Sequence, residues 1–545
     1  MHAVGTHDRC GTTVEPLIKQ QWFVKMDELI KPAVEAVKNG DIELIPKRME
    51  KTYFNWTDNI RDWCISRQLW WGHRIPAYFL PEGGYVVAGT AEEALKLAQE
   101  KTGNAHLKME DLRQDDDCLD TWFSSWLWPI SLFNGINDPN NEEINYYYPT
   151  SDLVTGPDII FFWVARMIMA GYEYKGDMPF KNVYFTGIVR DKLGRKMSKS
   201  LGNSPDPLEL IDKYGADGVR MGMMLAAPAG NDILFDDALC EQGRNFNNKI
   251  WNAFRLVKGW EVADMAQPEY AHLATEWFDS MLATTAAEVA DLFGKYRLSE
   301  ALMAVYKLFW DEFSSWYLEM IKPAYGQPID KATYEKTLGF FDNLLKLLHP
   351  FMPFITEDIY TRLPGSEETI MLSAWPKADA AFSFPAEAAA ADGLMDMVRA
   401  IRNVRAEMNV PPAKRAHVTI VTNAANEAAC RAAAPYLNKL AGASTVSVQL
   451  DKSGIDRNAV SVVSTLGEAF MPMNELIDIA KELDRLAKDR KHWQSEVSRA
   501  EGKLNNQGFL AKAPEKVVEE ERSKLEKAKE MLAKLEARIA EMQSM

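Results

Sequence analysis

Apolar and polar positions follow two different periods across residues 26–235. The run Val183–Val189 is strand-like, whereas Asp158–Ala170 places its apolar residues at helical spacing. Mixing of strand-like and helical segments is typical of an α/β sheet domain. We therefore predict an α/β domain over 26–235, preceded by residues 1–25, which show neither pattern.

From about residue 236 to 375 the apolar residues keep helical spacing in long segments. Examples are Asn247–Lys258, Glu300–Ile321 and Glu335–Leu348, and the proline-containing stretch His349–Phe354 interrupts the pattern. Successive long helices of this kind predict a helical bundle over 236–375.

A small α/β unit is predicted over 376–471, after an alanine-rich link near residues 386–392. Its expected elements are a helix through Val398–Met408, a strand at His417–Val421, a helix at Asn426–Leu440 and short strand-like runs to about residue 471. The prolines within Val410–Ala413 end the first of these helices because proline cannot continue a helix.

The last segment, 472–545, shows a regular spacing of apolar residues at three and four positions. One seam runs from Leu476 to Leu504 with Arg490 as its polar exception, and a second runs from Val518 to Met542 with Glu521 as its exception. Two such seams joined by a short glycine-containing turn predict an antiparallel coiled-coil hairpin. With about 30 residues in each helix, the arm would be about 45 Å long.

Composition narrows the class of protein. A chain of 545 residues is too long for one hydrophobic core, so several domains are expected. The sequence has no long uncharged apolar stretch, which predicts a cytoplasmic protein that does not enter a membrane. Its five cysteines form no CxxC pair, and His7 with Cys10 has no second ligand pair nearby, so no protein-bound metal is predicted.

The net charge of −16 lowers the expectation of a nucleic-acid partner without excluding it. Residues 474–545 contain 15 basic and 15 acidic side chains, so the deficit lies entirely in the preceding part of the chain. Phosphate contacts depend on a local basic face and not on the total charge.

One loop carries the clearest chemistry. Residues Gly194–Asn203 read GRKMSKSLGN, after the strand-like run that ends at Val189 and before a helix expected from Leu208. Lys196 and Lys199 can flank a polyphosphate, and the hydroxyl groups of serines 198 and 200 can donate to it. For two lysines alone, a solvated surface loop is the alternative.

The ten residues resemble the KMSKS signature of class I aminoacyl-tRNA synthetases. The resemblance implies that Lys199, assisted by Lys196, holds the phosphates of ATP, supplied with Mg²⁺ as a substrate, and stabilises the charge that develops during amino-acid activation. The ATP-binding residues so implied are Lys196, Met197, Ser198, Lys199 and Ser200, with Gly156 and Asp158 nearer the ribose and substrate. The implied fold is a partial Rossmann-like catalytic domain.

Other stretches are similar to the valyl members of this class. They are Asp152–Met167 (DLVTGPDIIFFWVARM) and Asp120–Ser125 (DTWFSS). Ile159 and Trp163 are four residues apart and share a helical face, and with Trp122 they could form a small apolar pocket for valine. Ordinary core packing is the alternative for these three side chains.

Three further stretches agree with this resemblance. Asp62–Gly72 resembles the return to the catalytic core after an editing insertion, and its three tryptophans could equally be simple core. Asn245–Asn252 resembles the start of an anticodon-binding bundle, and Leu504–Pro514 the turn of a tRNA-binding arm. The resemblance implies tRNA-Val as partner. Candidate contacts are Arg244, Asn248, Lys249 and Trp251.

One motif of the class is not found. Class I synthetases also carry a His-x-Gly-His sequence, and no two of the eight histidines here are three residues apart. Residues 1–25 resemble the end of an editing insertion. We therefore expect a C-terminal fragment of a valine–tRNA ligase, which is inactive alone and has a separate N-terminal half as a candidate partner. A non-catalytic tRNA-binding protein and an isoleucyl-type synthetase are the alternatives.

Overall fold

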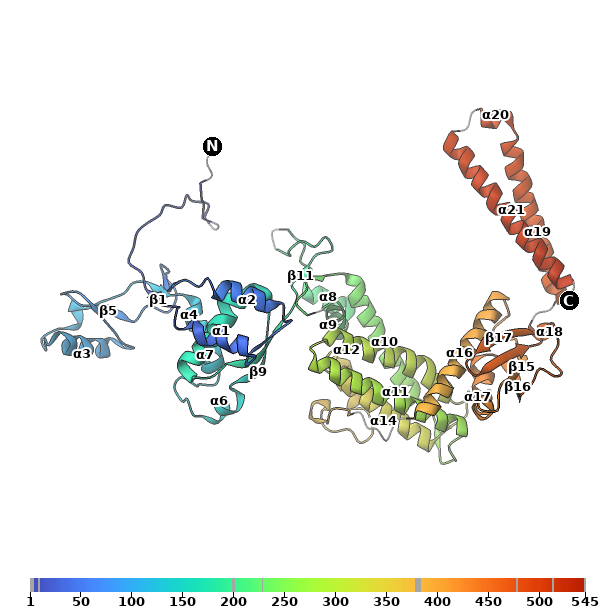
Figure 1. Ribbon diagram of the computed structural model, residues 1–545, viewed down its shortest axis with the longest axis horizontal. Coiled ribbons are helices and arrows are strands. Elements are labelled where there is room, and N and C mark those ends of the chain that lie inside the picture. Colours follow the sequence, from blue (N-terminus) through green and yellow to red (C-terminus); the bar gives the residue numbers. More distant parts are fainter. Residues whose placement is uncertain are drawn as a thin grey trace. The chain divides into compact units, whose positions relative to one another are not determined.

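The computed structural model describes residues 4–7, 10–198, 201–227, 229–377, 384–476, 479–511 and 514–543. The chain forms two compact units (Figure 1). The first comprises Met1–Lys213, Met221–Glu241 and Leu292–Glu300, and the second comprises Tyr214–Arg220, Gln242–Asp291 and Ala301–Met545.

A parallel three-stranded sheet forms the centre of the first unit. Its order is β2 (Glu43–Ile45), β10 (Phe180–Phe185) and β9 (Thr150–Thr155), with Val183 opposite both Leu44 and Leu153. The end of β10 is buried, as expected for a central parallel strand. Helix α1 (Ile30–Asn39) packs on α7 (Arg166–Lys175), and both contribute to the same apolar core as β10.

The predicted strand-like run Val183–Val189 is not one strand. Strand β10 ends at Phe185, and the chain resumes as β11 (Val189–Arg190), which pairs in parallel with β12 (Ile233–Leu234). The break lies where Gly187 passes the backbone of Asn231, because a Cβ on Gly187 would lie only 1.7 Å from the Asn231 carbonyl oxygen. The sequence is apolar on both sides of this break, so its pattern does not reveal the close approach of Gly187 to the Asn231 backbone.

The predicted helix Asp158–Ala170 is helical but irregular at its start. A 3-10 turn covers Pro157–Ile159, a π-helix covers Ile160–Ala165, and α7 follows. π-Helical turns are rare and concentrate at functional sites, and a period of 3.6 residues does not distinguish them from an α-helix.

The first unit also contains a small satellite layer that the sequence pattern did not separate. Strands β6 (Tyr85–Val87), β5 (Ala77–Phe79) and β7 (Arg113–Gln114) form an antiparallel sheet covered by α3 (Ala91–Thr102). Its core, which includes Tyr78 and Val86, is distinct from the core of the parallel sheet.

The predicted helical bundle is confirmed. Its helices are α10 (Asp237–Lys258), α11 (Glu269–Gly294), α12 (Leu298–Lys307), α14 (Lys331–Leu348) and α15 (Pro353–Tyr360). Helix α12 continues as a π-helix over Leu308–Tyr317 and then as the short α13 (Leu318–Ile321). The break between α14 and α15 covers residues 349–352 and so falls within the predicted interruption, although Phe354 already belongs to α15. Buried aromatic rings fill the interior, with Phe278 and Phe341 both within 6 Å of Phe313, measured between ring centroids.

The small α/β unit has the predicted elements, but its alanine-rich link is wrong. Residues 386–392 lie inside α16 (Pro385–Glu407), because alanine has the highest helix propensity and Pro385 occupies the first turn, where proline is tolerated. The sheet order is β16 (Ala443–Gln449), β15 (Ala416–Val421), β18 (Gly467–Met471) and β17 (Val460–Ser464). Helix α17 (Glu427–Leu440) packs on β16.

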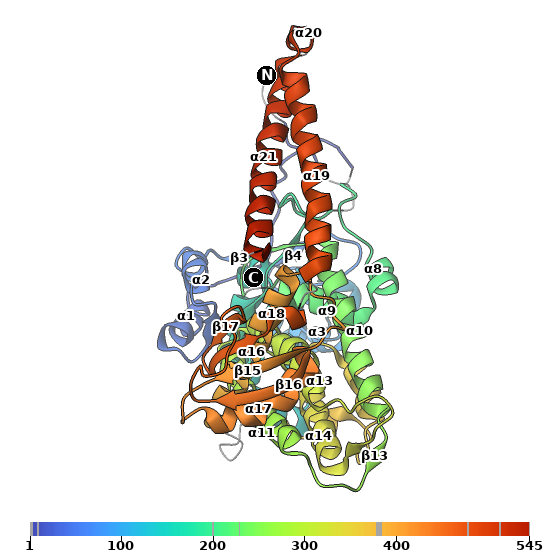
Figure 2. The same cartoon turned by 90° about the vertical axis from the view of Figure 1, so that its right-hand side faces the viewer.

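The last segment forms an antiparallel helical hairpin. Helices α19 (Ile479–Leu504) and α21 (Glu515–Gln543) run side by side, with the short α20 (Gln507–Leu510) at the turn (Figure 2). The polar exception Glu521 is buried in the seam, where its Oε1 accepts hydrogen bonds from Lys503 and Lys524 over 3.1 and 3.0 Å. Supercoiling of the two helices stays a prediction.

Candidate active site

The carboxyl ends of the three parallel strands meet at one edge of the sheet. Thr186, just after β10, donates its backbone N–H to the Thr155 carbonyl at the end of β9 over 2.8 Å. After β2, Arg48 donates to the Asn231 side chain over 2.8 Å, beside Gly187. In open α/β sheets this edge is where ligands bind.

The loop predicted to bind phosphate begins at this edge, directly after β11. Asp191 anchors it, because the Asp191 carboxylate accepts hydrogen bonds from the Leu193 and Arg195 backbones, from Arg195 Nε and from Asn203 Nδ2. These bonds hold the pKa of Asp191 well below its ordinary value, and the bond from Asn203 is the largest cause. The loop is therefore held at both ends by hydrogen bonds to one ionised carboxylate.

Asn203 also organises the interior of the loop. Its Oδ1 accepts from the Ser198 backbone N–H over 2.9 Å, and its Nδ2 donates to the Lys196 carbonyl over 3.3 Å. Leu201 donates back to the Ser198 carbonyl over 3.2 Å. Neither Asp191 nor Asn203 was singled out from the sequence, although both border the basic motif.

The basic side chains of the loop differ in their partners. Arg190 pairs with Asp232, Lys192 with Asp236 at 3.1 Å, and Arg195 with Asp191 at 2.8 Å. Lys196 is exposed and forms no ion pair with any residue that the structure describes. Within the described part of the loop, Lys196 is thus the cation whose charge no acidic side chain offsets.

The other residues of the predicted ATP site are placed in part. Met197 and Ser198 are half-buried, Gly156 is half-buried with Ile188 beside it, and Asp158 is exposed. Lys199 and Ser200 lie outside the described residues, so their predicted contacts with ATP stay predictions.

The residues predicted to form an amino-acid pocket lie on two elements, the short helix α4 (Thr121–Ser125) and the start of the irregular helix. Trp122 stands on α4, and its ring stacks on Phe162 with the centroids 4.5 Å apart and the planes at 27°. Ile159 ends the 3-10 turn and Trp163 lies within the π-helix, and all three predicted side chains are half-buried. The sequence does not single out Phe162, because it lies in the π-helix, where the spacing of an ordinary helix does not place side chains.

The three tryptophans of Asp62–Gly72 have different environments. Trp63 is buried in the core, as the simple-core alternative predicts. Trp70 and Trp71 are 106% and 93% exposed, so core packing is wrong for these two.

The residues expected to contact RNA lie on α10 and do not form one face. Arg244, Asn248 and Trp251 follow each other at helical spacing, whereas Lys249 points elsewhere and places its Nζ 5.3 Å from the centre of the Trp310 ring. Asn248 is exposed, and Trp251 has the Arg362 guanidinium 5.6 Å from its ring centre. The first three could therefore contact one ligand together.

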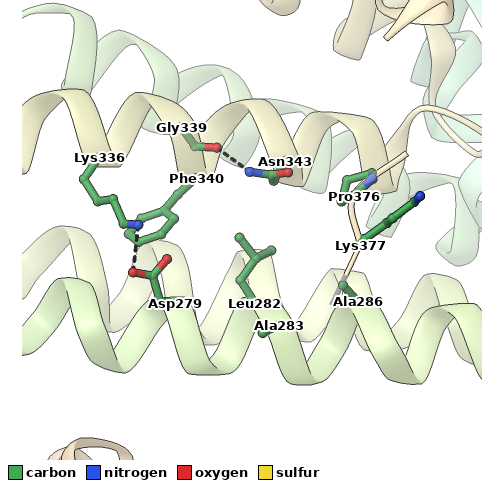
Figure 3. A pocket seen from close by; sticks show the side chains of 10 residues that line it. All are labelled: Asp279, Leu282, Ala283, Ala286, Lys336, Gly339, Phe340, Asn343, Pro376 and Lys377. Atoms are coloured by element: carbon green, nitrogen blue, oxygen red, sulfur yellow. Dashed lines mark hydrogen bonds and ion pairs between the residues drawn. The ribbon is translucent and has the colours of Figure 1, made fainter. Parts of the chain in front are cut away.

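A separate cavity of about 200 Å³ opens between α11 and α14 (Figure 3). Lys336 Nζ lies 2.8 Å from Asp279 Oδ2 at one end of it, and Leu282 and Phe340 add apolar surface. Burial raises the pKa of Asp279 above its ordinary value, and the ion pair with Lys336 opposes that rise. None of the predicted RNA contacts lines this cavity.

Neither a metal centre nor a membrane-spanning helix is found among the described residues. No group of three or more His, Cys, Asp or Glu side chains among them could hold a metal ion. Of the helices in the described parts of the chain, none has the length and apolar character required to cross a membrane.

Comparisons with known proteins agree along most of the chain. Residues 10–236 match the family of class I tRNA synthetases for isoleucine, leucine, methionine and valine, residues 275–420 match the anticodon-binding domain of tRNA ligases, and residues 478–543 match the valyl-tRNA synthetase tRNA-binding arm. The valine–tRNA ligase of Phocaeicola vulgatus is 66% identical over 541 residues, which cover 98% of this chain and 61% of that protein. That of Parabacteroides distasonis is 59% identical over 540 residues, with the same two shares.

Among solved structures, methionyl-tRNA synthetase of Mycobacterium tuberculosis in complex with methionyl-adenylate is 18% identical. The alignment covers 67% of each chain with a TM-score of 0.47.

By these sequence matches, residues 10–236 are similar to class I aminoacyl-tRNA synthetases. The two named relatives within that class are valine–tRNA ligases, and the chain spans 61% of the length of each.

Proposed function

We propose that this chain contributes to a valine–tRNA ligase, which activates valine with ATP and transfers it to tRNA-Val. The observation that carries the proposal is Lys196, a cation with no acidic partner among the described residues, on a loop held at the ligand-binding edge of a parallel sheet. The names of the relatives support valine over isoleucine as the amino acid.

In the proposed first step, a carboxylate oxygen of valine attacks the α-phosphorus of ATP, supplied with Mg²⁺. A new P–O bond forms, the bond to the β,γ-phosphates breaks, and pyrophosphate leaves. Lys196, with Lys199 and the hydroxyls of serines 198 and 200, would neutralise the negative charge on these phosphates, and Met197 would pack beside them. Such catalysis consists of positioning and electrostatic stabilisation without a protein nucleophile.

The proposed valine pocket uses Trp122, Ile159 and Trp163, with Phe162 stacked on Trp122. The stacked pair of Trp122 and Phe162 supports this assignment, because two rings held 4.5 Å apart make a stiff apolar wall. Gly156 and Asp158 follow the end of β9 and would lie nearer the ribose. The pocket would then admit an isopropyl side chain next to the activated carboxylate.

In the proposed second step, a hydroxyl of the terminal ribose of tRNA attacks the valyl carbonyl, and AMP leaves. Arg244, Asn248, Lys249 and Trp251 are proposed contacts of the anticodon loop, and the hairpin of α19 and α21 is a proposed contact elsewhere on the tRNA. The match of residues 478–543 to a tRNA-binding arm supports the latter.

Exchange of radioactive pyrophosphate into ATP tests the proposal. The remaining part of the Phocaeicola vulgatus relative would be supplied as a separate polypeptide, since this chain spans 61% of that protein. We expect valine-dependent exchange in the mixture. Lys196→Ala should lower kcat/KM by about 100-fold, the scale seen when one stabilising donor is removed.

Lys192→Ala is the matched control, because Lys192 lies in the same loop but is paired with Asp236. It should retain exchange within about twofold, as expected for an exposed ion pair. Equal losses in the two variants would contradict the role of Lys196. Lys199→Ala without any loss would contradict the role taken from the resemblance.

The second candidate function is that of a non-catalytic tRNA-binding protein. The match of residues 478–543 to a tRNA-binding arm favours it, because that match by itself requires no catalytic site. It predicts salt-sensitive binding of tRNA and no valyl-adenylate in any mixture. Binding that persists after removal of residues 472–545 would place the main contacts in the bundle.

A further inference from the structure

A buried arginine lies among the aromatic rings beside the proposed valine pocket. Arg166 is the first residue of α7, and only 5% of it is exposed. Its guanidinium carbon lies 3.6 Å from the centre of the Trp63 ring, 5.2 Å from that of Trp122 and 5.5 Å from that of Phe162. Cations over aromatic faces at such distances are attracted by the ring quadrupole.

The guanidinium depends on these rings because it has few other partners. Arg166 Nε and Nη1 are buried and have no hydrogen-bond partner among the described residues. Burial lowers the pKa of Arg166 to about 10, so the group is still a cation at neutral pH. A buried cation with unpaired N–H groups is costly unless it has a compensating interaction, and the ring faces supply that interaction here.

Asp120 links the same arginine to the backbone that carries Trp122. Its Oδ1 accepts from the Trp122 backbone N–H over 3.0 Å, and its Oδ2 accepts from Trp63 Nε1 over 3.1 Å and pairs with Arg67. The charge of Asp120 favours the cationic form of Arg166. Trp122 is thus held at its backbone by Asp120 and at its ring by Phe162 and Arg166.

We propose that Arg166 is a positioning residue, which sets the orientation of the Trp122 and Phe162 rings and thereby the selection of a small branched amino acid. The proposal rests on the proposed function, in which Trp122 forms a wall of the valine pocket. Arg166 lies behind the wall and does not touch the substrate. A stiff wall excludes a side chain one methylene larger, whereas a wall that can tilt accommodates it.

Fluorine NMR of the full chain labelled with 5-fluorotryptophan tests the geometry without requiring activity. The Trp122 resonance would be assigned from its loss in Trp122→Phe. Arg166→Met, which keeps an unbranched apolar side chain but removes the charge and the flat face, should shift the Trp122 and Trp63 resonances. Arg166→Lys should also shift them, because a compact ammonium cannot lie flat against a ring.

Arg405→Met is the matched control. Arg405 is also buried, its pKa is lowered by burial, and its Nη1 has no hydrogen-bond partner among the described residues. Its guanidinium binds the Lys414 carbonyl. This variant should leave the Trp122 resonance in place. An unchanged Trp122 resonance in folded Arg166→Met, or in Arg166→Lys if the first does not fold, would overturn the proposal.

The exchange assay with the separate N-terminal part then tests selection. In Arg166→Lys we expect the KM for valine to rise about 10-fold and the preference for valine over isoleucine to fall, with the KM for ATP within twofold of its original value. A lower kcat at unchanged valine KM and unchanged preference would reduce Arg166 to a structural residue. If the unsubstituted chain gives no valine-dependent exchange, the proposed function fails, while the fluorine result still decides whether Arg166 orients Trp122.

Discussion

Asn203 Nδ2 donates a hydrogen bond to Asp191 Oδ2 over 3.0 Å, and this contact closes the loop that carries Lys196. The two residues are twelve positions apart, one directly after β11 and the other at the end of the basic motif. The same amide bonds the Lys196 carbonyl, so the closing contact also sets the backbone of the lysine proposed to bind ATP.

We expect Asn203→Ala to raise the KM for ATP by about 10- to 100-fold in the pyrophosphate exchange assay. Misplacing a binding group by about 1 Å has effects of this size. The control is Asn182→Ala, which removes a half-buried asparagine that likewise bonds a backbone carbonyl and an aspartate. An unchanged KM for ATP in Asn203→Ala would contradict the closing role.

The carboxylate of Asp191 should titrate below the ordinary aspartate value of about 3.9. Its lowered pKa means that it stabilises the folded loop above the unfolded-state pKa, and that this contribution is lost as pH falls through the lower folded-state pKa. Carbon NMR of the side-chain carboxyl measures the midpoint. In Asn203→Ala the midpoint should move upward, and a midpoint of 4 or more in the original chain would count against the network.

Gly187→Ala should destabilise the first unit. The added Cβ would meet the Asn231 carbonyl oxygen at 1.7 Å, so β10 or the segment before β12 must move, at a cost of about 1–3 kcal/mol. Gly156→Ala is the control, because its Cβ would meet only Ile188 at 3.4 Å. Thermal unfolding followed by circular dichroism compares the two, and equal melting temperatures would refute the predicted clash.

The buried Lys439 should make the free energy of unfolding increase with pH in alkaline solution. Its Nζ donates to the carbonyls of Met320 and Lys322 at the end of α13, and burial lowers its pKa to about 8. Between about pH 8 and the unfolded-state value near 10.4, the unfolded chain holds a proton that the folded chain does not. Stability should therefore rise with pH, by at most about 1.4 kcal/mol per pH unit.

Denaturant unfolding of the second unit at pH 8 and pH 10 measures this effect. Lys439→Met should remove the dependence on pH, whereas replacement of the exposed Lys452 by Met should preserve it. A dependence that is the same in both variants would assign it to another group.

Local patterns in the sequence were sufficient for most of the elements. The helices of the bundle, the hairpin and the phosphate-loop motif were predicted because helical spacing and a contiguous motif depend only on neighbours in the chain. The predicted alanine-rich link is wrong for a local reason as well: residues 386–392 contain few large apolar side chains, but alanine favours a helix.

The sequence by itself determined which helices form, which loop carries the cations and which family the chain resembles. Tertiary structure alone decided that Asn203 closes the loop on Asp191, that Phe162 stacks on Trp122, and that Arg166 lies among the rings. These contacts join residues that no helical or strand period relates. The two contacts of Trp122, with Phe162 and with Arg166, also depend on where α4 packs against the π-helical turn. Packing between elements sets them, and no single element shows that packing in its own sequence.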